Sequence, residues 1–170
     1  MTARIANGGK AVVPRLIRPV AEDGTDVDPD FKDLGISRRS LDVVREGMNR
    51  VTNVRRGTAY RARISEEGME MSGKTGTAQV RRISKAERET RVLKNHERPW
   101  RERDHALFVG FAPSDNPRYA AAVVVEHGGG GSKVAAPIAR DLLLETQKRD
   151  PANRRTAPAA ARAPAKSEEI

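Results

Sequence analysis

Two runs of β-forming residues constrain the fold of this chain most strongly. HALFVGFA begins at His105 and YAAAVVVE begins at Tyr119, and the stretch between them, 113–118, consists mostly of turn-forming residues. This arrangement predicts an antiparallel hairpin. The stretch MSGKTGTAQV at 71–80 also has the pattern of a strand, so we expect a three-stranded antiparallel sheet.

Amphipathic helices are expected before and after these strands. Ser37 is a suitable N-terminal cap, and Ile36 lies before it with the spacing of a hydrophobic staple. One buried face is then predicted from apolar residues that recur every three or four positions: Leu41, Val44, Met48 and Val51. After the glycines at 128–131, a second helix is expected to place on one face Val134, Ile138 and Leu142, with Ala135, Ala139 and Leu143 beside them. The predicted fold class is therefore α+β, an antiparallel sheet packed with helices.

The chain is organised as one domain followed by a tail. At 170 residues it is long enough for one domain with a core. We assign residues 1–147 to the domain, with a basic insertion at 81–103 between two strands. Residues 148–170 are rich in Ala, Pro and Arg without apolar periodicity, and we expect them to be disordered. Residues 1–6 have the pattern of a helix end before Asn7-Gly8-Gly9, which suggests a preceding segment.

Composition excludes some kinds of site. The chain has no cysteine, so disulfides, thiol catalysis and cysteine zinc sites are excluded. The net charge of +9 favours anionic partners without naming one. No apolar run approaches the roughly 18 residues of a membrane span, and the first residues lack the apolar core of a signal peptide.

The strand at 71–80 is unusual because it replaces packing side chains with polar and small ones. Strand alternation places Thr75 and Thr77 on one face, and Ser72, Lys74 and Gly76 on the other. An ammonium group and two hydroxyls close together suit a carboxylate, and a glycine allows a ligand to approach the backbone. The alternative interpretation is a surface strand with a glycine bulge and a solvated lysine.

Neighbouring motifs favour the first interpretation. SGKTGTAQV is followed by RDHALFVGFAPSDNP and VVVEHGGGG, and is preceded by TARIANGG and REGMNRV. Lys-Thr-Gly is a motif of penicillin-binding proteins and serine β-lactamases. In this order, the motifs resemble the C-terminal part of the transpeptidase domain of class B penicillin-binding proteins, of the rod-shape, elongation-specific type. The resemblance covers roughly Met1 to Lys148, and 81–103 matches least.

The resemblance implies a peptidoglycan D,D-transpeptidase, in which a serine attacks the D-Ala-D-Ala amide of a stem peptide and passes the acyl group to an amine. By the same resemblance, Lys74 shapes the potential of the site, and Thr75 and Thr77 bind the terminal carboxylate of substrate or β-lactam. The Thr77 N–H is one oxyanion-hole donor, and Gly76 lets the substrate lie against the strand. The family needs no cofactor, its partners are membrane proteins of the elongation complex, and it works at the periplasmic face of the inner membrane.

The chain departs from the family pattern at the nucleophile. No serine has a lysine three positions later, so the sequence contains no nucleophile and no general base of this type. Ser114-Asp115-Asn116 matches the family's second motif but follows Lys-Thr-Gly, in the wrong order, and we expect a plain turn there. We therefore predict no turnover by the isolated chain, and we expect the outer edge of the hairpin to be bare and prone to aggregation.

Two other features of the sequence have both a functional and a plain structural interpretation. His105 and His127 are expected near each other, which makes a metal site conceivable, but we assign them a structural role and predict no metal. The insertion at 81–103 is expected to overhang one end of the site, either as a guide for anionic substrates or as a solvated excursion, and the second is favoured.

The rival function is a basic module that binds a polyanion. Nucleic acid is not expected, since the chain has only six aromatic residues (Trp 1, Tyr 2, Phe 3) and no nucleic-acid-binding motif. A D,D-carboxypeptidase or a β-lactamase of the same superfamily remains a third alternative.

Overall fold

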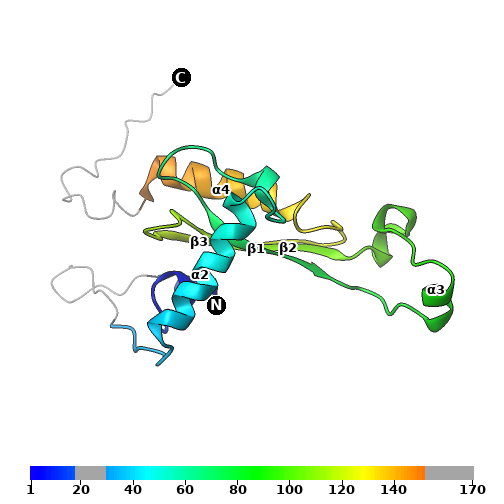
Figure 1. Cartoon of the computed structure of the whole chain (residues 1–170), viewed down its shortest axis with the longest axis horizontal. Helices are drawn as coiled ribbons and strands as arrows, with labels where there is room; N and C mark the ends of the chain where they lie inside the picture. The colour runs from blue at the N-terminus through cyan, green and yellow to red at the C-terminus, as the bar shows by residue number, and fades with distance from the viewer. Residues whose placement is uncertain (18–29, 152–170) are drawn as a thin grey trace, which may run out of the picture.

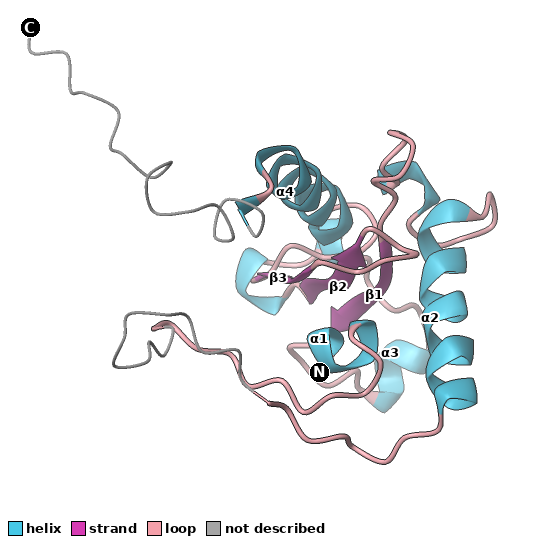
Figure 2. Ribbon diagram, turned by 90° about the vertical axis from the view of Figure 1, so that its left-hand side faces the viewer, coloured by secondary structure: helices cyan, strands magenta, loops and turns pink. Residues whose placement is uncertain are grey.

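The chain folds around a three-stranded antiparallel sheet packed with helices, as the sequence predicts, and the helices lie on both faces of the sheet. The computed structural model describes residues 1–17 and 30–151. The strand order is β1-β2-β3, with β1 at Ser72–Ala78, β2 at His105–Ala112 and β3 at Tyr119–Val125. Helix α4 (Ala135–Arg149) covers one face, and α1 (Thr2–Ala6) and α2 (Arg38–Asn53) lie against the other (Figures 1 and 2). The α+β fold class is confirmed.

The alternating side chains of β2 supply two cores. Ala106 and Phe108 point toward α4, where they pack with three helix alanines and Leu143 in the larger cluster. Phe111 points to the other face and packs with Ala6 of α1 and Met48 of α2. The α4 face of the central strand is thus buried throughout, whereas on the other face Phe111 is buried and Leu107 and Val109 are half-buried.

The buried face of α4 differs from the expectation. Its buried residues are Ala135, Ala136, Ala139 and Leu143, whereas Ile138 is 47% and Leu142 is 54% exposed. The prediction that Val134, Ile138 and Leu142 line the packing face was therefore wrong for the last two. Two apolar stripes lie side by side on this helix, and the alanine stripe lets the helix axis come close to the sheet.

Helix α2 begins where predicted. The Ser37 side chain accepts a hydrogen bond from the Ser40 N–H at 3.2 Å, which caps the helix. Leu41 and Met48 are buried as expected, but Val44 is 45% exposed. Val44 is exposed because it lines an open pocket between α1, α2 and the sheet.

Residues 79–104 leave the end of β1 and return at the start of β2. They contain α3 (Lys85–Glu89) and the short 3-10 helices η2 (Asn95–Glu97) and η3 (Trp100–Glu102), and they project beyond the end of the sheet (Figure 1). We call residues 79–104 the arm. The arm includes the basic insertion predicted at 81–103, which remains our assignment for that segment.

The described part of the chain ends with helix α4. The helix continues through Arg149 and closes at Asp150, which has φ 41°. The Asp150 carboxylate accepts hydrogen bonds from the Tyr119 hydroxyl at 2.6 Å and from Arg118 at 2.8 Å. Most of the predicted disordered tail, 152–170, lies outside the described residues.

The N-terminal segments agree with the sequence pattern in part. Helix α1 ends at Ala6, and Gly8 and Gly9 follow with positive φ angles of 85° and 93°. Lys10 forms an isolated bridge with Asp33, while residues 18–29 of the expected irregular segment and loop lie outside the described residues. Across the described ranges, no helix has both the length and the apolar character needed to cross a bilayer.

Candidate functional site

The Lys-Thr-Gly strand forms one edge of the sheet. β1 pairs with β2 alone among the described residues, in a register that joins Lys74 to Val109, Thr75 to Phe108, Gly76 to Leu107 and Thr77 to Ala106. The opposite edge of β1 carries unpaired peptide groups, which can bind an extended ligand by adding hydrogen bonds to the sheet. The predicted site residues therefore lie on a free edge.

The orientation of the Gly76–Thr77 peptide follows from a close contact. A Cβ built on Gly131 would lie 2.3 Å from both the Gly76 and the Leu107 carbonyl oxygens, so these two oxygens point into the space between the paired strands. In a planar trans peptide the C=O and the following N–H point in opposite directions. The Thr77 N–H therefore points to the free edge.

The Lys74 ammonium group is also at this edge. Its Nζ donates a hydrogen bond to the Thr75 carbonyl oxygen at 2.7 Å, and the side chain is exposed. The peptide groups alternate along the strand, so the Thr75 carbonyl points the same way as the Thr77 N–H. The Thr75 hydroxyl contacts the Thr58 hydroxyl at 3.1 Å. One cation and one backbone donor thus share the edge, with the Thr77 side chain exposed beside them.

An apolar pocket of about 420 Å³ adjoins Lys74 between α1, α2 and the sheet. Its walls include Ile5, Val44, Met48 and Val109. This pocket accounts for the exposure of Val44, because the apolar face of α2 continues here past the residues that cover it. The site therefore combines a polar strand edge with an open apolar wall.

Buried hydrogen bonds fix the start of β1. The Met71 carbonyl oxygen accepts from the Thr52 hydroxyl at 2.6 Å and from the Asn53 amide at 3.0 Å. The Ser72 hydroxyl donates to the Ser114 hydroxyl at 2.8 Å, which donates to the Glu70 carbonyl at 3.0 Å. These contacts were missed at the sequence level, since the partners are up to 44 residues apart and no local pattern marks them.

Ser114 therefore has a structural position, in the bend that joins β2 to β3. Asp115 and Asn116 are exposed in the same bend, and the Asp115 carboxylate caps the Asn116 N–H at 2.8 Å. The expectation of a plain turn at Ser114-Asp115-Asn116 agrees with this geometry.

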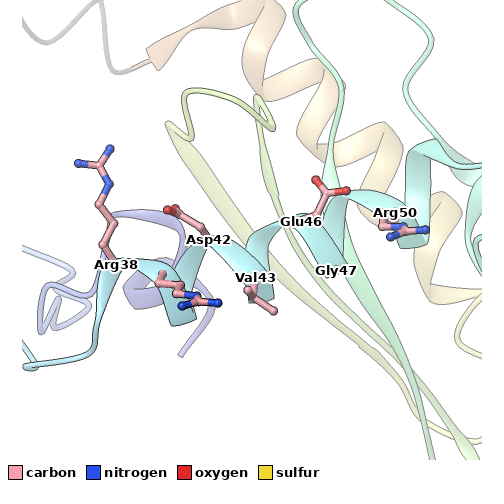
Figure 3. A pocket seen from close by; sticks show the side chains of 7 residues that line it. Arg38, Asp42, Val43, Glu46, Gly47 and Arg50 are labelled. Carbon is pink, nitrogen blue, oxygen red and sulfur yellow. The ribbon is translucent and has the colours of Figure 1, made fainter.

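A second surface pocket, of about 680 Å³, lies on the outer face of α2 and includes none of the strand residues. It is lined by Arg38, Arg39, Asp42, Val43, Glu46, Gly47 and Arg50, whose side chains spread along the helix (Figure 3). Opposite charges four residues apart are typical of a solvated helix face. We therefore place the candidate site at β1 and not here.

The two histidines considered as metal ligands do come together. Their ring centroids are 4.8 Å apart, and the His127 ring also lies 4.4 Å from that of Trp100. The Nδ1 atoms have backbone partners, because His105 accepts from the His127 N–H at 2.8 Å and His127 lies 3.0 Å from the Arg103 carbonyl. In the part of the chain that the structure describes, no group of three or more potential ligands could hold a metal ion.

The base of the arm is held by a buried ion pair next to these histidines. Arg98 and Asp104 are joined at 3.2 Å, with side chains only 6% and 9% exposed. Asn95 exchanges two hydrogen bonds with Asp104, at 2.9 and 3.2 Å. The arm thus has a fixed base beside the end of β1.

The chain matches known cell-wall proteins over most of its length. A family model described as "Penicillin binding protein transpeptidase domain" matches residues 1–144. The peptidoglycan D,D-transpeptidase MrdA of Haemophilus influenzae is 32% identical over 84% of this chain, and that of Acinetobacter baumannii is 34% identical over 88%. The chain spans 22% of the length of each of these two relatives.

Solved structures give the same result. PBP2 of Pseudomonas aeruginosa in complex with WCK 5153 is 35% identical, with a TM-score of 0.64 over 96% of this chain and 32% of that one. PBP2 of Helicobacter pylori, in complex with MreC, is 28% identical, with a TM-score of 0.65 over 87% of this chain and 23% of that one. Because the family match takes in all three strands and the Lys-Thr-Gly motif, this chain belongs to the penicillin-binding protein transpeptidase family and carries part of its transpeptidase domain.

Proposed function

We propose that this chain supplies the substrate-binding strand of a peptidoglycan D,D-transpeptidase. The observation that carries the proposal is the free edge of β1, where the Lys74 ammonium and the outward Thr77 N–H lie beside two threonine hydroxyls. In this proposal Lys74, Thr75 and Thr77 bind the terminal carboxylate of a stem peptide or a β-lactam. Charge-assisted hydrogen bonds to a carboxylate are about twice as strong as neutral ones, which favours this guest.

The Thr77 N–H has a separate role in the proposed reaction. A serine hydroxyl would attack the carbonyl carbon of the D-Ala-D-Ala amide, and the carbonyl oxygen would gain negative charge. The N–H donates to that oxygen, and a donor of this kind is typically worth about 2.7 to 4 kcal/mol. The amide nitrogen leaves with the terminal D-Ala after gaining a proton, and an amine of a second stem then takes the acyl group.

The Lys74 side chain must change partner when a carboxylate binds. In the structure its ammonium donates a hydrogen bond to the Thr75 carbonyl, on the same edge. A carboxylate replaces a neutral acceptor with a charged one, so the exchange favours binding. Gly76 leaves the strand backbone accessible, because nothing larger than a hydrogen projects from it.

The first test is a titration of the ¹⁵N-labelled chain with a peptide that ends in D-Ala-D-Ala. We expect the amide signals of Thr75, Gly76 and Thr77 to shift with millimolar affinity, on the order of the weakest specific complexes. Lys74→Met should weaken binding at least tenfold. Lys85→Met, which removes an exposed lysine of the arm, should leave the affinity within a factor of two. The same peptide with a C-terminal amide should not bind, and equal affinity for it would contradict the proposal.

The second test concerns catalysis by the isolated chain. Loss of a catalytic serine costs about a millionfold in a well-studied serine protease, so we expect no β-lactam adduct on the chain. Incubation with a penicillin followed by intact-mass spectrometry measures this directly. A stoichiometric adduct would show that a serine of this chain is a nucleophile after all.

The polyanion-binding alternative has no structural support among the described residues. Some arm cations are paired with acidic side chains, as in Arg91–Glu97, and Arg98 is buried against Asp104, so neither side chain is free for a polyanion. A salt-dependent mobility shift with DNA or RNA would revive this alternative.

We also propose that the intact protein works at the periplasmic face of the inner membrane with an elongation partner. The support is the similarity to Helicobacter pylori PBP2, whose solved complex contains MreC. Fractionation of cells that express the intact protein, with cross-linking to the MreC counterpart, tests both parts. Recovery in the cytosolic fraction would contradict the location.

A further inference from the structure

The loop before α4 makes a close backbone contact with β1. Gly131 is buried, and a Cβ built on it would lie 2.3 Å from the carbonyl oxygens of both Gly76 and Leu107 and 3.0 Å from the Gly76 nitrogen. Real Cβ atoms do not approach other atoms closer than 3.0 Å. The loop backbone therefore rests directly on the paired strands, and any larger residue would push on them.

The peptide that Gly131 touches is the one that carries the candidate oxyanion donor. The Gly76 carbonyl and the Thr77 N–H belong to a single planar unit. A push on the carbonyl oxygen tilts the whole plane, so the N–H on the opposite edge moves as well. Contact from the α4 face thus sets the direction of a donor on the free edge.

The loop itself is firmly held. The Gly131 carbonyl accepts from the Ala136 N–H at 2.8 Å, which ties it to the first turn of α4. The Gly130 carbonyl accepts from the N–H groups of Lys133 and Val134, both at 3.1 Å. On the other side, the Gly129 N–H donates to the Asp104 carbonyl at 2.8 Å. A loop fixed at both ends can act as a rigid support.

We propose that Gly131 is a positioning residue that holds the Gly76–Thr77 peptide so that the Thr77 N–H meets the ligand oxygen. The inference rests on the proposed function, because it assumes that this donor binds a ligand. It goes further by assigning a role to a loop residue 54 positions away from Thr77 that touches neither substrate nor Lys74.

The neighbouring glycine offers a matched control. A Cβ built on Gly130 meets nothing within 4 Å, and its φ lies outside the left-handed region. Gly130→Ala therefore adds the same methyl group one residue away, in the same loop, without contact with β1. Gly131→Ala and Gly130→Ala differ chiefly in whether the methyl pushes on the Gly76 carbonyl.

The experiment is the D-Ala-D-Ala titration of the ¹⁵N-labelled chain, repeated with both variants. In Gly131→Ala we expect the free-state Thr77 amide signal to move, its ligand-induced shift to be lost, and affinity to fall about tenfold. The ligand-induced shift of the Thr75 amide should persist at high peptide concentration, because carboxylate binding remains. Gly130→Ala should match the wild-type chain within a factor of two.

The outcomes separate this inference from the proposed function. A folded Gly131→Ala chain with an unchanged Thr77 signal and wild-type affinity would overturn the positioning role. A wild-type chain that binds no peptide would overturn the proposed function, and the free-state Thr77 signals of the two variants would still show whether Gly131 sets the orientation of the Gly76–Thr77 peptide.

A milder pair of variants covers the case in which Gly131→Ala does not fold. Ala136→Gly loosens the turn that holds the Gly131 carbonyl, whereas Ala139→Gly makes the same change one turn later; each costs about 1 kcal/mol of helix stability. With the D-Ala-D-Ala peptide bound, we expect the Thr77 amide hydrogen to exchange faster in Ala136→Gly than in the wild-type chain. In Ala139→Gly its exchange should not be faster. Equal exchange in the two variants would contradict the inference.

Discussion

The start of β1 and the arm that continues it are held by different kinds of interaction. Met71 and Ser72 are fully buried and are fixed by hydrogen bonds with uncharged side chains of α2 and the β2–β3 bend. The arm is held mainly by ion pairs, such as Arg81–Glu87 at its beginning and Arg98–Asp104 at its base. The start of β1 and the adjacent arm should therefore respond differently to changes in pH and salt.

The difference bears on the site. Uncharged buried hydrogen bonds change little with pH or salt, so the position of Lys74 and Thr77 should be constant over a wide range of conditions. Surface ion pairs are screened by salt and lost in acid, so the parts of the arm held by such pairs should loosen first, before the buried Arg98–Asp104 pair at its base. The strand can keep its geometry while the arm beside it moves.

The largest expected effect comes from the core that supports the strand. Phe108 is fully buried, and its ring fills the space that a side chain at position 73 would occupy. Phe108→Ala should lower the free energy of unfolding by about 3 to 5 kcal/mol, measured by urea denaturation. Val124→Ala, at a site that is 62% exposed on β3, should change it by less than about 0.5 kcal/mol. Similar values for the two variants would show that the sheet is not held by its α4-facing core.

The next effect tests the buried charge at the arm base. Asp104→Asn leaves Arg98 buried without its counter-charge, so the local unfolding free energy of the arm should fall by about 3 kcal/mol. Hydrogen exchange of the arm amides measures this. Glu102→Gln is the control, because Glu102 is half exposed and lies 3.7 Å from Arg81, and it should have little effect. Equal protection in the two variants would contradict a dominant buried pair.

Local patterns predicted much of this fold. The hairpin, the Lys-Thr-Gly strand and the Ser37 cap were all read from neighbouring residues, since alternation, turn residues and capping are local properties. The buried face of α4 was not predicted correctly, because Ile138 and Leu142 have the same helical period as the alanines that are buried. Periodicity finds an apolar stripe but does not choose between two adjacent stripes.

The residues of the candidate site could be named from the sequence, whereas the contacts that support them could not. Lys74 and Thr77 stand in a motif, whereas the resting of Gly131 on Gly76 joins segments far apart in the sequence. The sequence of a glycine run before a helix does not indicate which residues the run contacts. Thr52 also lacks a local signal, since a helix threonine ordinarily bonds to its own helix.

A smaller effect is expected from the hydrogen bonds that fix the start of β1. Thr52→Val keeps the shape of the side chain but removes the bond to the Met71 carbonyl, so stability should fall by about 1 to 2 kcal/mol. Thr146→Val is the matched control, because its hydroxyl bonds to the Leu142 carbonyl on an exposed helix face. Urea denaturation should show little change in the control. If the free energy of unfolding depended on salt differently in Thr52→Val and in the wild-type chain, the hydrogen bond from Thr52 to the Met71 carbonyl would not act as an uncharged one.

The smallest expected effect is the acid response of the arm. Hydrogen bonds from Arg81 and from the Ser84 backbone lower the pKa of Glu87 from 4.5 to about 2. Because the folded pKa is depressed, the contribution to arm stability is complete above about pH 4.5 and is lost as the pH falls toward 2. NMR titration of the Glu87 carboxyl carbon should show this low midpoint, and Arg81→Gln should raise it, whereas the neighbouring exposed Arg82→Gln should not. A midpoint near 4.5 in the unchanged chain would show that the Arg81–Glu87 pair does not hold the arm in solution. The contrast between a strand fixed by uncharged bonds and an arm fixed by charges would then rest on the other arm pairs, chiefly the buried Arg98–Asp104.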